Sequence, residues 1–289
     1  RWQATGVNMV HIPHKMSSKT ANAMALQHRP RKRFGQNFLR DTNVIERIVD
    51  AIHPTGDDHI IEIGPGQGAL TKYLLPACRK LEVIELDRDL AAHLAEGLQK
   101  EEHFQIHQQD VLKFDFDTLD AEEKSLRIVG NLPYNISTPV MFYLLKYQHL
   151  IKDMTFMLQL EVVNRLAAKT GDKNYGRLGL MVQYHCQVEH LFNVPSAAFT
   201  PKPKVSSAIV RLAPHPTLPA PARDVNCLKL VIRTAFNQRR KILKNSLKSL
   251  VSEEVLNTLP LDTSLRPENL SLQDYVLISD AISNSDRND

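Results

Sequence analysis

The sequence has few of the features that mark secreted, metal-binding or membrane-spanning proteins. Its 289 residues include three cysteines (Cys78, Cys186 and Cys227), which lie far apart and form no C-x-x-C pair. That spacing excludes a disulfide framework and a structural zinc site, and it is typical of a reducing compartment. The twelve histidines show no ligand spacing, so we assign no metal. Because no run of about 18 apolar residues occurs, we also expect no membrane-spanning helix.

Acidic residues are missing from two segments of the chain. Residues 1–40 hold eight Lys and Arg, and residues 229–248 hold seven, with no Asp or Glu in either segment, although the net charge is only +4. Segregated positive charge of this kind indicates a polyanion binder. A solvated basic helix together with an unstructured tail would give the same pattern, so charge alone leaves both interpretations open.

The N-terminal segment lacks the apolar core of a secretory signal. It begins with Arg1, and Met9, Met16 and Met24 are each possible start sites. A transit peptide, a disordered extension and a start upstream of the true one all stay open. We treat residues 1–28 as a disordered extension and leave them out of the fold.

Short apolar stretches alternate with helical patterns through the first two thirds of the chain. Strands are expected at residues 59–64, 81–86, 104–110, 126–130 and 154–160, with two more at 188–194 and 205–212. This alternation predicts an α/β fold with a doubly wound parallel sheet, in which ligands bind beyond the carboxyl ends of the strands. Four prolines in residues 213–222 indicate a stiff linker. We therefore predict a sheet domain over residues 29–215 and a smaller all-helical domain over residues 216–289.

A glycine-rich turn, "EIGPGQGALT", follows the first strand of this alternation. Gly64-x-Gly66-x-x-Ala69 fits the dinucleotide fingerprint, and Glu85 lies about twenty residues on, where a ribose-binding acid is expected. NAD and S-adenosylmethionine both offer a ribose to such an acid, so both cofactors stay open here, as does a tight turn without a ligand. Asp110 leaves the third strand in a position to accept a hydrogen bond from an adenine amine.

The fourth strand runs directly into Asn131-Leu132-Pro133-Tyr134. An exocyclic adenine amine is a poor nucleophile, because its lone pair is delocalised into the ring. The carboxamide oxygen of Asn131 and the backbone carbonyl of Leu132 would accept its two N–H groups and aim the lone pair at a methyl donor. Pro133 fixes the backbone, and Tyr134 offers a face on which an extruded base can stack. On this interpretation positioning, not a strong base, supplies the rate; a simple strand-ending Asn-x-Pro turn is the alternative.

Several motifs occur together in one order. They are "FGQNFL", "EIGPGQGALT", "VIELD", "QQD", "GNLPYNIS", "FTPKPKVSSAIVRL" and "RTAFNQRRKILKNSL". Over about residues 31–285 the chain closely resembles the KsgA-type ribosomal RNA small-subunit adenine dimethyltransferases. The resemblance implies a Rossmann-like class I methyltransferase domain that binds S-adenosylmethionine.

The resemblance also implies roles for individual residues. Cofactor contacts are expected at Asn37, Leu39, Gly64, Gly66, Glu85, Asp110 and Asn131. Asn131 and Tyr134 would hold the target adenine, Leu132 and Pro133 would shape its site, and Phe199 would close the stack from the other side. The implied substrate is a pair of adjacent adenosines in the 3′-terminal hairpin of 16S rRNA, within the small (30S) subunit or its precursor. The enzyme would act late in assembly, in the cytoplasm, as a monomer.

The same resemblance gives the basic segments a role in RNA binding. The basic helix that we expect from Lys229 to Ser249 holds Arg233, Arg239, Arg240, Lys241, Lys244 and Lys248, and Arg31, Lys32 and Arg33 would lie at the mouth of the site. Such residues neutralise phosphates without reading sequence, so binding should weaken steeply with salt.

Three rival functions stay in view. An erythromycin-resistance type of methyltransferase shares the fold and modifies a single adenine of large-subunit rRNA; "RTAFNQRRK" and "FTPKPKV" favour the small-subunit enzyme. A nicotinamide dehydrogenase is disfavoured by the cluster from Asn131 to Tyr134. A non-catalytic assembly or transcription factor is disfavoured because Glu85, Asp110 and Asn131 are all intact.

Overall fold

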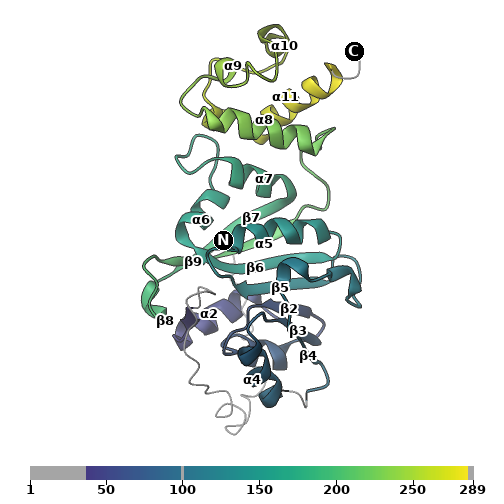
Figure 1. The fold of residues 1–289 in the computed structure, drawn as a ribbon, viewed down its shortest axis with the longest axis vertical. Coiled ribbons are helices and arrows are strands. Elements are labelled where there is room, and N and C mark those ends of the chain that lie inside the picture. The colour runs from purple at the N-terminus through teal and green to yellow at the C-terminus, as the bar shows by residue number, and fades with distance from the viewer. Residues whose placement is uncertain (1–36, 99–100, 286–289) are drawn as a thin grey trace, which may run out of the picture.

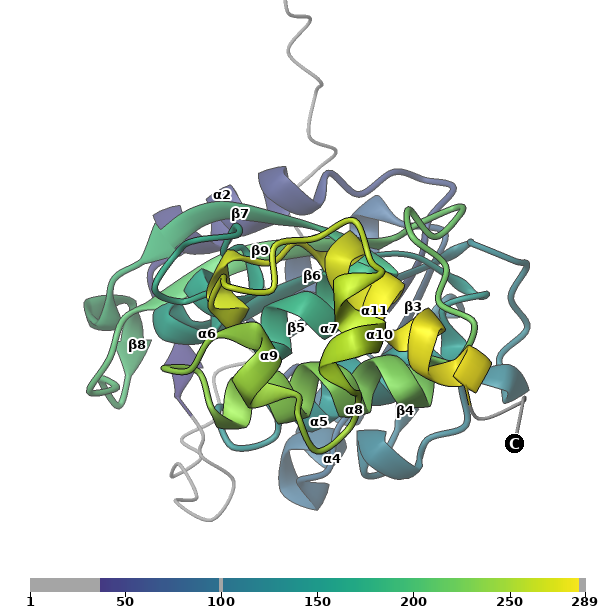
Figure 2. The same cartoon turned by 90° about the horizontal axis from the view of Figure 1, so that it is seen from above.

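A computed structural model describes residues 37–98 and 101–285. The expected N-terminal extension and the basic residues Arg31, Lys32 and Arg33 lie outside this part of the chain. The described residues form a sheet with helices on both of its faces and a layer of helices stacked beyond one end of the sheet layer (Figure 1). Seen from above, the C-terminal helices lie over α5 and α7 (Figure 2). None of the described helices is long and apolar enough to cross a membrane.

The central sheet has seven strands in the order β4-β3-β2-β5-β6-β9-β7. They are β2 (His59–Ile63), β3 (Lys80–Ile84), β4 (Phe104–His107), β5 (Leu126–Asn131), β6 (Ile151–Gln159), β7 (Cys186–Val194) and β9 (Ser207–Pro214). The first five in this order run parallel, as expected. Strand β9 is antiparallel to both β6 and β7, because it returns from β7 without a crossover helix. The sheet is therefore mixed at one end.

Apolar side chains on both faces of the sheet explain why it is covered on both sides. Ile60 and Val83 point to one face, where they pack with helices α2 (Thr42–Ile52), α3 (Thr71–Leu74) and α4 (Arg88–Leu98). Ile61, Ile128 and Phe156 point to the other face and pack with α5 (Ser137–Leu144), α6 (Leu160–Leu166) and α7 (Arg177–His185). Strand order reverses between β3 and β5, on either side of β2. That reversal point is where a ligand site is expected.

The described residues beyond 216 form helices only. They are α8 (Val225–Asn237), α9 (Leu243–Ser246), α10 (Glu253–Asn257), the short 3-10 helix η7 (Pro267–Asn269) and α11 (Leu272–Ser285). These helices share a buried cluster with Leu180 and Tyr184 of α7. Because α7 also packs against the sheet, the division of the chain at residue 215 stays a prediction.

The continuous basic helix expected from Lys229 to Ser249 is wrong. Helix α8 ends at Asn237, the chain turns through residues 238–242, and α9 begins at Leu243. The turn is needed because Leu243 and Leu247 are fully buried among the C-terminal helices. Arg239, Arg240 and Lys241 therefore lie on the turn and not along a helix face.

A second, two-stranded sheet joins segments that are far apart in the sequence. Strand β1 (Phe38–Leu39) pairs antiparallel with β8 (Phe199–Thr200), and Leu39 lies opposite Phe199. The backbone N–H of Arg40 extends the pairing by donating to the carbonyl of Ala198 at 2.8 Å. This sheet fixes residues 38 and 39 beside residues 199 and 200. Strands this short carry no periodicity, so the sequence did not predict them.

Candidate active site

A cavity of about 280 Å³ lies beyond the carboxyl ends of β2, β3, β4 and β5. It is lined by every predicted cofactor and adenine contact: Asn37, Leu39, Gly64, Gly66, Glu85, Asp110, Asn131, Leu132, Pro133, Tyr134 and Phe199. Phe38, Glu62, Gln67 and Leu86 also line it, although the sequence suggested no role for them. The structure therefore brings residues from six separate segments to one place.

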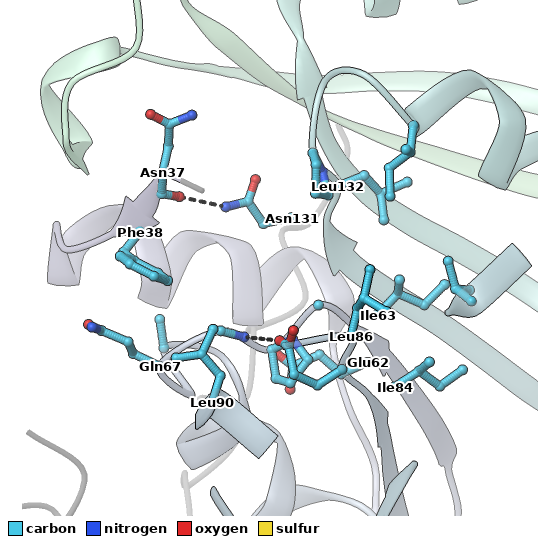
Figure 3. A pocket seen from close by; sticks show the side chains of 18 of the residues that line it. Asn37, Phe38, Glu62, Ile63, Gln67, Ile84, Leu86, Leu90, Asn131 and Leu132 are labelled. Atoms are coloured by element: carbon cyan, nitrogen blue, oxygen red, sulfur yellow. Dashed lines mark hydrogen bonds between the residues drawn. The ribbon is translucent and has the colours of Figure 1, made fainter. Parts of the chain in front are cut away.

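The glycine turn forms one wall of this cavity. Gly64 and Gly66 have φ values of +65° and +57°, in the left-handed region that disfavours side chains. A Cβ at Gly66 would lie 3.3 Å from the ring of Phe38, which packs over the turn (Figure 3). Backbone N–H groups can therefore approach a ligand closely here. This is the setting that a nucleoside-containing cofactor needs.

Glu85 lies beside the turn, at the end of β3. Its Oε2 accepts the backbone N–H of Gly66 at 3.2 Å, and its Oε1 accepts that of Asp87 at 2.8 Å. The residue is 6% exposed, and burial raises the pKa of the carboxyl, while the two backbone hydrogen bonds oppose this rise. Each carboxylate oxygen can accept a second hydrogen bond, so both hydroxyls of a ribose can be held.

Asp110 lies at the neighbouring strand exit. Its Oδ1 accepts the backbone N–H of Leu112 at 3.0 Å and so begins a short 3-10 helix, η3 (Val111–Lys113). That hydrogen bond fixes the side chain at the cavity wall while Oδ2 can still accept. The geometry fits the predicted contact with an adenine amine.

Glu62 is a buried acid beneath the glycine turn. The hydroxyl of Thr71 donates to its Oε2 at 2.7 Å, which links β2 to the start of α3. Burial raises the pKa of Glu62 to about 7; the Thr71 hydrogen bond opposes this rise, and the charge of Glu85 adds to it. The sequence feature that could have pointed to Glu62 is a carboxylate among the isoleucines of the strand "HIIEIG".

Replacing Glu62 with glutamine should remove a pH-dependent loss of stability. The folded pKa of about 7 exceeds the ordinary value of 4.5, so the native state favours the protonated acid. Wild-type stability should therefore fall as pH rises through this window and then level off. Glutamine still accepts from Thr71, so the variant should gain about 2.5 kcal/mol on the wild type between about pH 5 and about pH 8 in urea unfolding. The exposed Glu96→Gln is the control, and an equal difference at both pH values would contradict the prediction.

Asn131 ends β5 with its carboxamide in the cavity. Its Nδ2 donates to the backbone carbonyl of Asn37 at 3.2 Å (Figure 3). Because a carbonyl only accepts, this bond settles which branch of the amide is the nitrogen. Within the described residues Oδ1 accepts no hydrogen bond, and neither does the backbone carbonyl of Leu132. Two acceptors thus lie beside the glycine turn.

The two aromatic residues predicted to hold a base both line the cavity. The hydroxyl of Tyr134 bonds to Oγ of the buried Ser207 at 2.9 Å, which fixes its ring against the start of β9. Phe199 is 4% exposed and is held by the pairing of β8 with β1. Ser207 had no signal in the sequence, since only the tertiary structure places its hydroxyl near Tyr134.

The predicted RNA-binding residues that the structure describes lie on the helical part, away from this cavity. Arg240, Lys241 and Lys248 are exposed. Arg239 is engaged: its Nε lies 3.5 Å from Glu268, and it donates to the carbonyl of Lys173. Lys244 forms an ion pair with Glu253 at 3.1 Å. Arg233 is exposed on α8 and lines a second groove.

The fold and the site together define a class of protein. A glycine turn and a buried acid at adjacent strand exits, with a carboxamide, a proline and an aromatic ring at a third, are the features of an S-adenosylmethionine-dependent methyltransferase. The family model for "Ribosomal RNA adenine dimethylase" matches residues 27–284. The chain belongs to the ribosomal RNA adenine dimethylase family, and its methyl donor is S-adenosylmethionine.

Comparison with known proteins supports this assignment. The "Ribosomal RNA small subunit methyltransferase A" of Pseudomonas syringae pv. tomato is 57% identical over 257 residues, covering 89% of this chain and 96% of that protein. The protein of the same name from Marinobacter nauticus is 55% identical over 258 residues, covering 89% and 93%. A third, from Pseudomonas aeruginosa, is 56% identical over 256 residues, covering 89% and 96%.

Solved structures show the same fold. A dimethyladenosine transferase from Plasmodium falciparum superposes with a TM-score of 0.69 at 26% identity, covering 83% of this chain and 95% of that one. The 23S rRNA methyltransferase ErmE gives a TM-score of 0.68 at 24% identity, covering 86% and 100%. The predicted class I methyltransferase fold is confirmed. Because the chain belongs to a methyltransferase family, the rival functions of a nicotinamide dehydrogenase and of a non-catalytic factor are not retained.

Proposed function

We propose that this protein dimethylates two adjacent adenosines in the 3′-terminal hairpin of 16S rRNA, late in assembly of the small subunit. The names of its relatives support the small subunit as the site of action. We further propose that it acts as a monomer in the cytoplasm, where small subunits are assembled. The observation that carries the proposal is the amide of Asn131, held by Asn37 with its oxygen left to accept beside the glycine turn.

The residues of the cavity explain how a weak nucleophile is used. The bound cofactor supplies an electrophilic methyl group. In the first transfer, Oδ1 of Asn131 and the carbonyl of Leu132 would each accept one N–H of the adenine amine, which turns the lone pair of the nitrogen out of conjugation; one proton leaves the nitrogen with each methyl group gained. Pro133 has no N–H to compete for these acceptors. Tyr134 and Phe199 stack on the extruded base and exclude water from it.

The exposed cations on the turn after α8 should hold the subunit but not the cofactor. Reversing Arg239 would also break its bond to Glu268, so Arg240 and Lys241 are the sharper targets. Arg240→Glu with Lys241→Glu should weaken binding to undermethylated small subunits by about tenfold or more. The slope of log affinity against log salt concentration (the salt slope) should become shallower by about two. Affinity for S-adenosylmethionine, measured by calorimetry, should not change.

The control for this pair is Arg79→Glu, an exposed cation in the turn before β3, at the opposite end of the sheet from the cavity. It should leave the affinity for subunits intact. Equal losses of subunit and cofactor affinity in the double variant would contradict a docking role.

The proposed function has a direct test. Labelled S-adenosylmethionine is incubated with the enzyme and undermethylated 30S subunits, and in parallel with 50S subunits, and the labelled nucleotides are then mapped. Two adjacent dimethylated adenosines near the 3′ end of the small-subunit rRNA are expected. Labelling of the large subunit alone would overturn the proposal in favour of the erythromycin-resistance type of enzyme.

A further inference from the structure

A second cavity, of about 840 Å³, lies between the sheet domain and the C-terminal helices. We call it the α5–α8 groove. Its walls come from α5, α7, α8 and the short 3-10 helix η5 (Leu145–Tyr147), and α8 lies over α5 in both Figure 1 and Figure 2. None of the cofactor or adenine contacts described above lines it. The groove is therefore a separate site.

Four cations surround this groove: Lys146 on η5, Arg177 on α7, and Lys229 and Arg233 on α8. All four are exposed, and the lining residues include no Asp or Glu. In the part of the chain that the structure describes, none of the four forms a salt bridge, in contrast to Arg239 and Lys244. Like charges held together without a counterion repel each other, and an anion in the groove would relieve that repulsion.

Apolar side chains form the floor between these cations. Phe142, Leu178, Met181 and Ile232 contribute to it, and the ring of Phe142 is half-buried. The Nδ1 atom of His185 is buried there without a hydrogen-bond partner among the described residues. A free phosphate would leave such a floor unused. An apolar floor with a cationic rim and a few polar side chains (Thr138, His185 and Asn226) matches a nucleotide, whose base is flat and apolar and whose phosphate is charged.

The groove begins close to the active-site cavity. Ile136 lines the active-site cavity, and Thr138, two residues along at the start of α5, lines the groove. A strand whose adenine enters the first cavity can therefore continue past the start of α5 into the second. An RNA strand is the occupant that both the charge and this position favour.

We propose that the α5–α8 groove binds a non-target nucleotide of the rRNA substrate, with its phosphate on the four cations and its base against the apolar floor. The inference rests on the proposed function, since it takes rRNA as the substrate. It adds a second nucleotide site to the one that holds the target adenine.

Charge reversal tests the rim of the groove. Arg177→Glu should weaken binding to undermethylated small subunits by about tenfold, because a charge-assisted contact is lost, and should lower the salt slope by about one. Lys229→Glu should do the same, while both variants keep wild-type affinity for S-adenosylmethionine. Arg79→Glu, outside the groove, should keep wild-type subunit affinity and slope. Unchanged affinity and slope in both rim variants would overturn the proposal.

Photocrosslinking tests the occupant itself. A benzoylphenylalanine at Leu178, on the floor, is irradiated in the full-length enzyme bound to undermethylated small subunits, and the attached nucleotide is mapped by primer extension. We expect a crosslink to small-subunit rRNA at a nucleotide other than the two target adenosines. A crosslink to a ribosomal protein, to a target adenosine alone or to nothing would overturn the proposal. The two proposals fail separately: subunits that crosslink but are not methylated contradict only the function, and subunits that are methylated but do not crosslink contradict only the groove.

Discussion

Asn131→Ala should lower methyl transfer by about 10³-fold, because no other side chain that we place at the adenine amine accepts its hydrogen. The variant also loses the hydrogen bond to the carbonyl of Asn37, which costs about 1 kcal/mol of folding stability. The protein should therefore still fold. Single-turnover transfer to undermethylated small subunits measures the effect free of product release.

The matched control is Asn43→Ala, the same chemical change on the exposed surface of α2. It should transfer methyl groups at the wild-type rate. Calorimetric titration of Asn131→Ala with S-adenosylmethionine separates loss of the cofactor from loss of positioning. Appreciable transfer by a folded Asn131→Ala that still binds cofactor would show that another group aligns the amine.

Local patterns predicted most of the sheet domain. The five parallel strands appear within a few residues of their expected positions, because each is an apolar run bounded by clear turn residues. Glu85 and Asp110 could be placed at the cavity because each leaves a strand next to the glycine turn in a fold whose strand exits meet at one edge. For these two residues, the position in the sequence is enough to predict the position in the fold.

Features that depend on distant contacts were not predictable in this way. The pairing of β1 with β8 joins segments about 160 residues apart, and it is what places Asn37 against Asn131. The bond from Tyr134 to Ser207 likewise exists only once β9 has returned beside β6. Neither leaves a periodic trace in the sequence, although both shape the site.

The ion pairs of the basic segment 229–248 could not be predicted from the sequence either. Its lack of acids was visible in the sequence, but the acids that partner Arg239 and Lys244 lie beyond it, at Glu268 and Glu253. Conversely, Lys146 and Arg177 lie outside both basic segments, and only folding brings them to the α5–α8 groove. Charge along the chain therefore indicates a polyanionic partner, but it does not show which cations are left without acidic partners or which lie together in the fold.

Arg127→Ala should unfold the protein more readily than any other single change considered above. Arg127 is 6% exposed, at the amino end of β5. Its guanidinium donates to Asp58 at 2.8 Å and to Asp153 at 3.1 Å, and also to the carbonyl of Ile52 at 2.6 Å, where α2 ends. Removing it leaves two carboxylates without their main partner, of which Asp58 is also buried. The expected loss is about 3–5 kcal/mol in urea unfolding.

The loss should shrink in acid, which distinguishes an unpaired charge from a simple cavity. In the wild type, burial acts to raise the pKa of Asp58, but hydrogen bonds from Arg127 and Thr55 outweigh it and hold the pKa below its usual value of 3.8. Without Arg127 the burial remains, so the pKa should rise and the native state should favour the protonated acid. The variant should then recover part of its deficit between about pH 7 and about pH 5, whereas the exposed Arg79→Ala should show no deficit at either pH. A deficit that stays constant with pH would mean that lost packing, and not the buried carboxylates, is what Arg127 prevents.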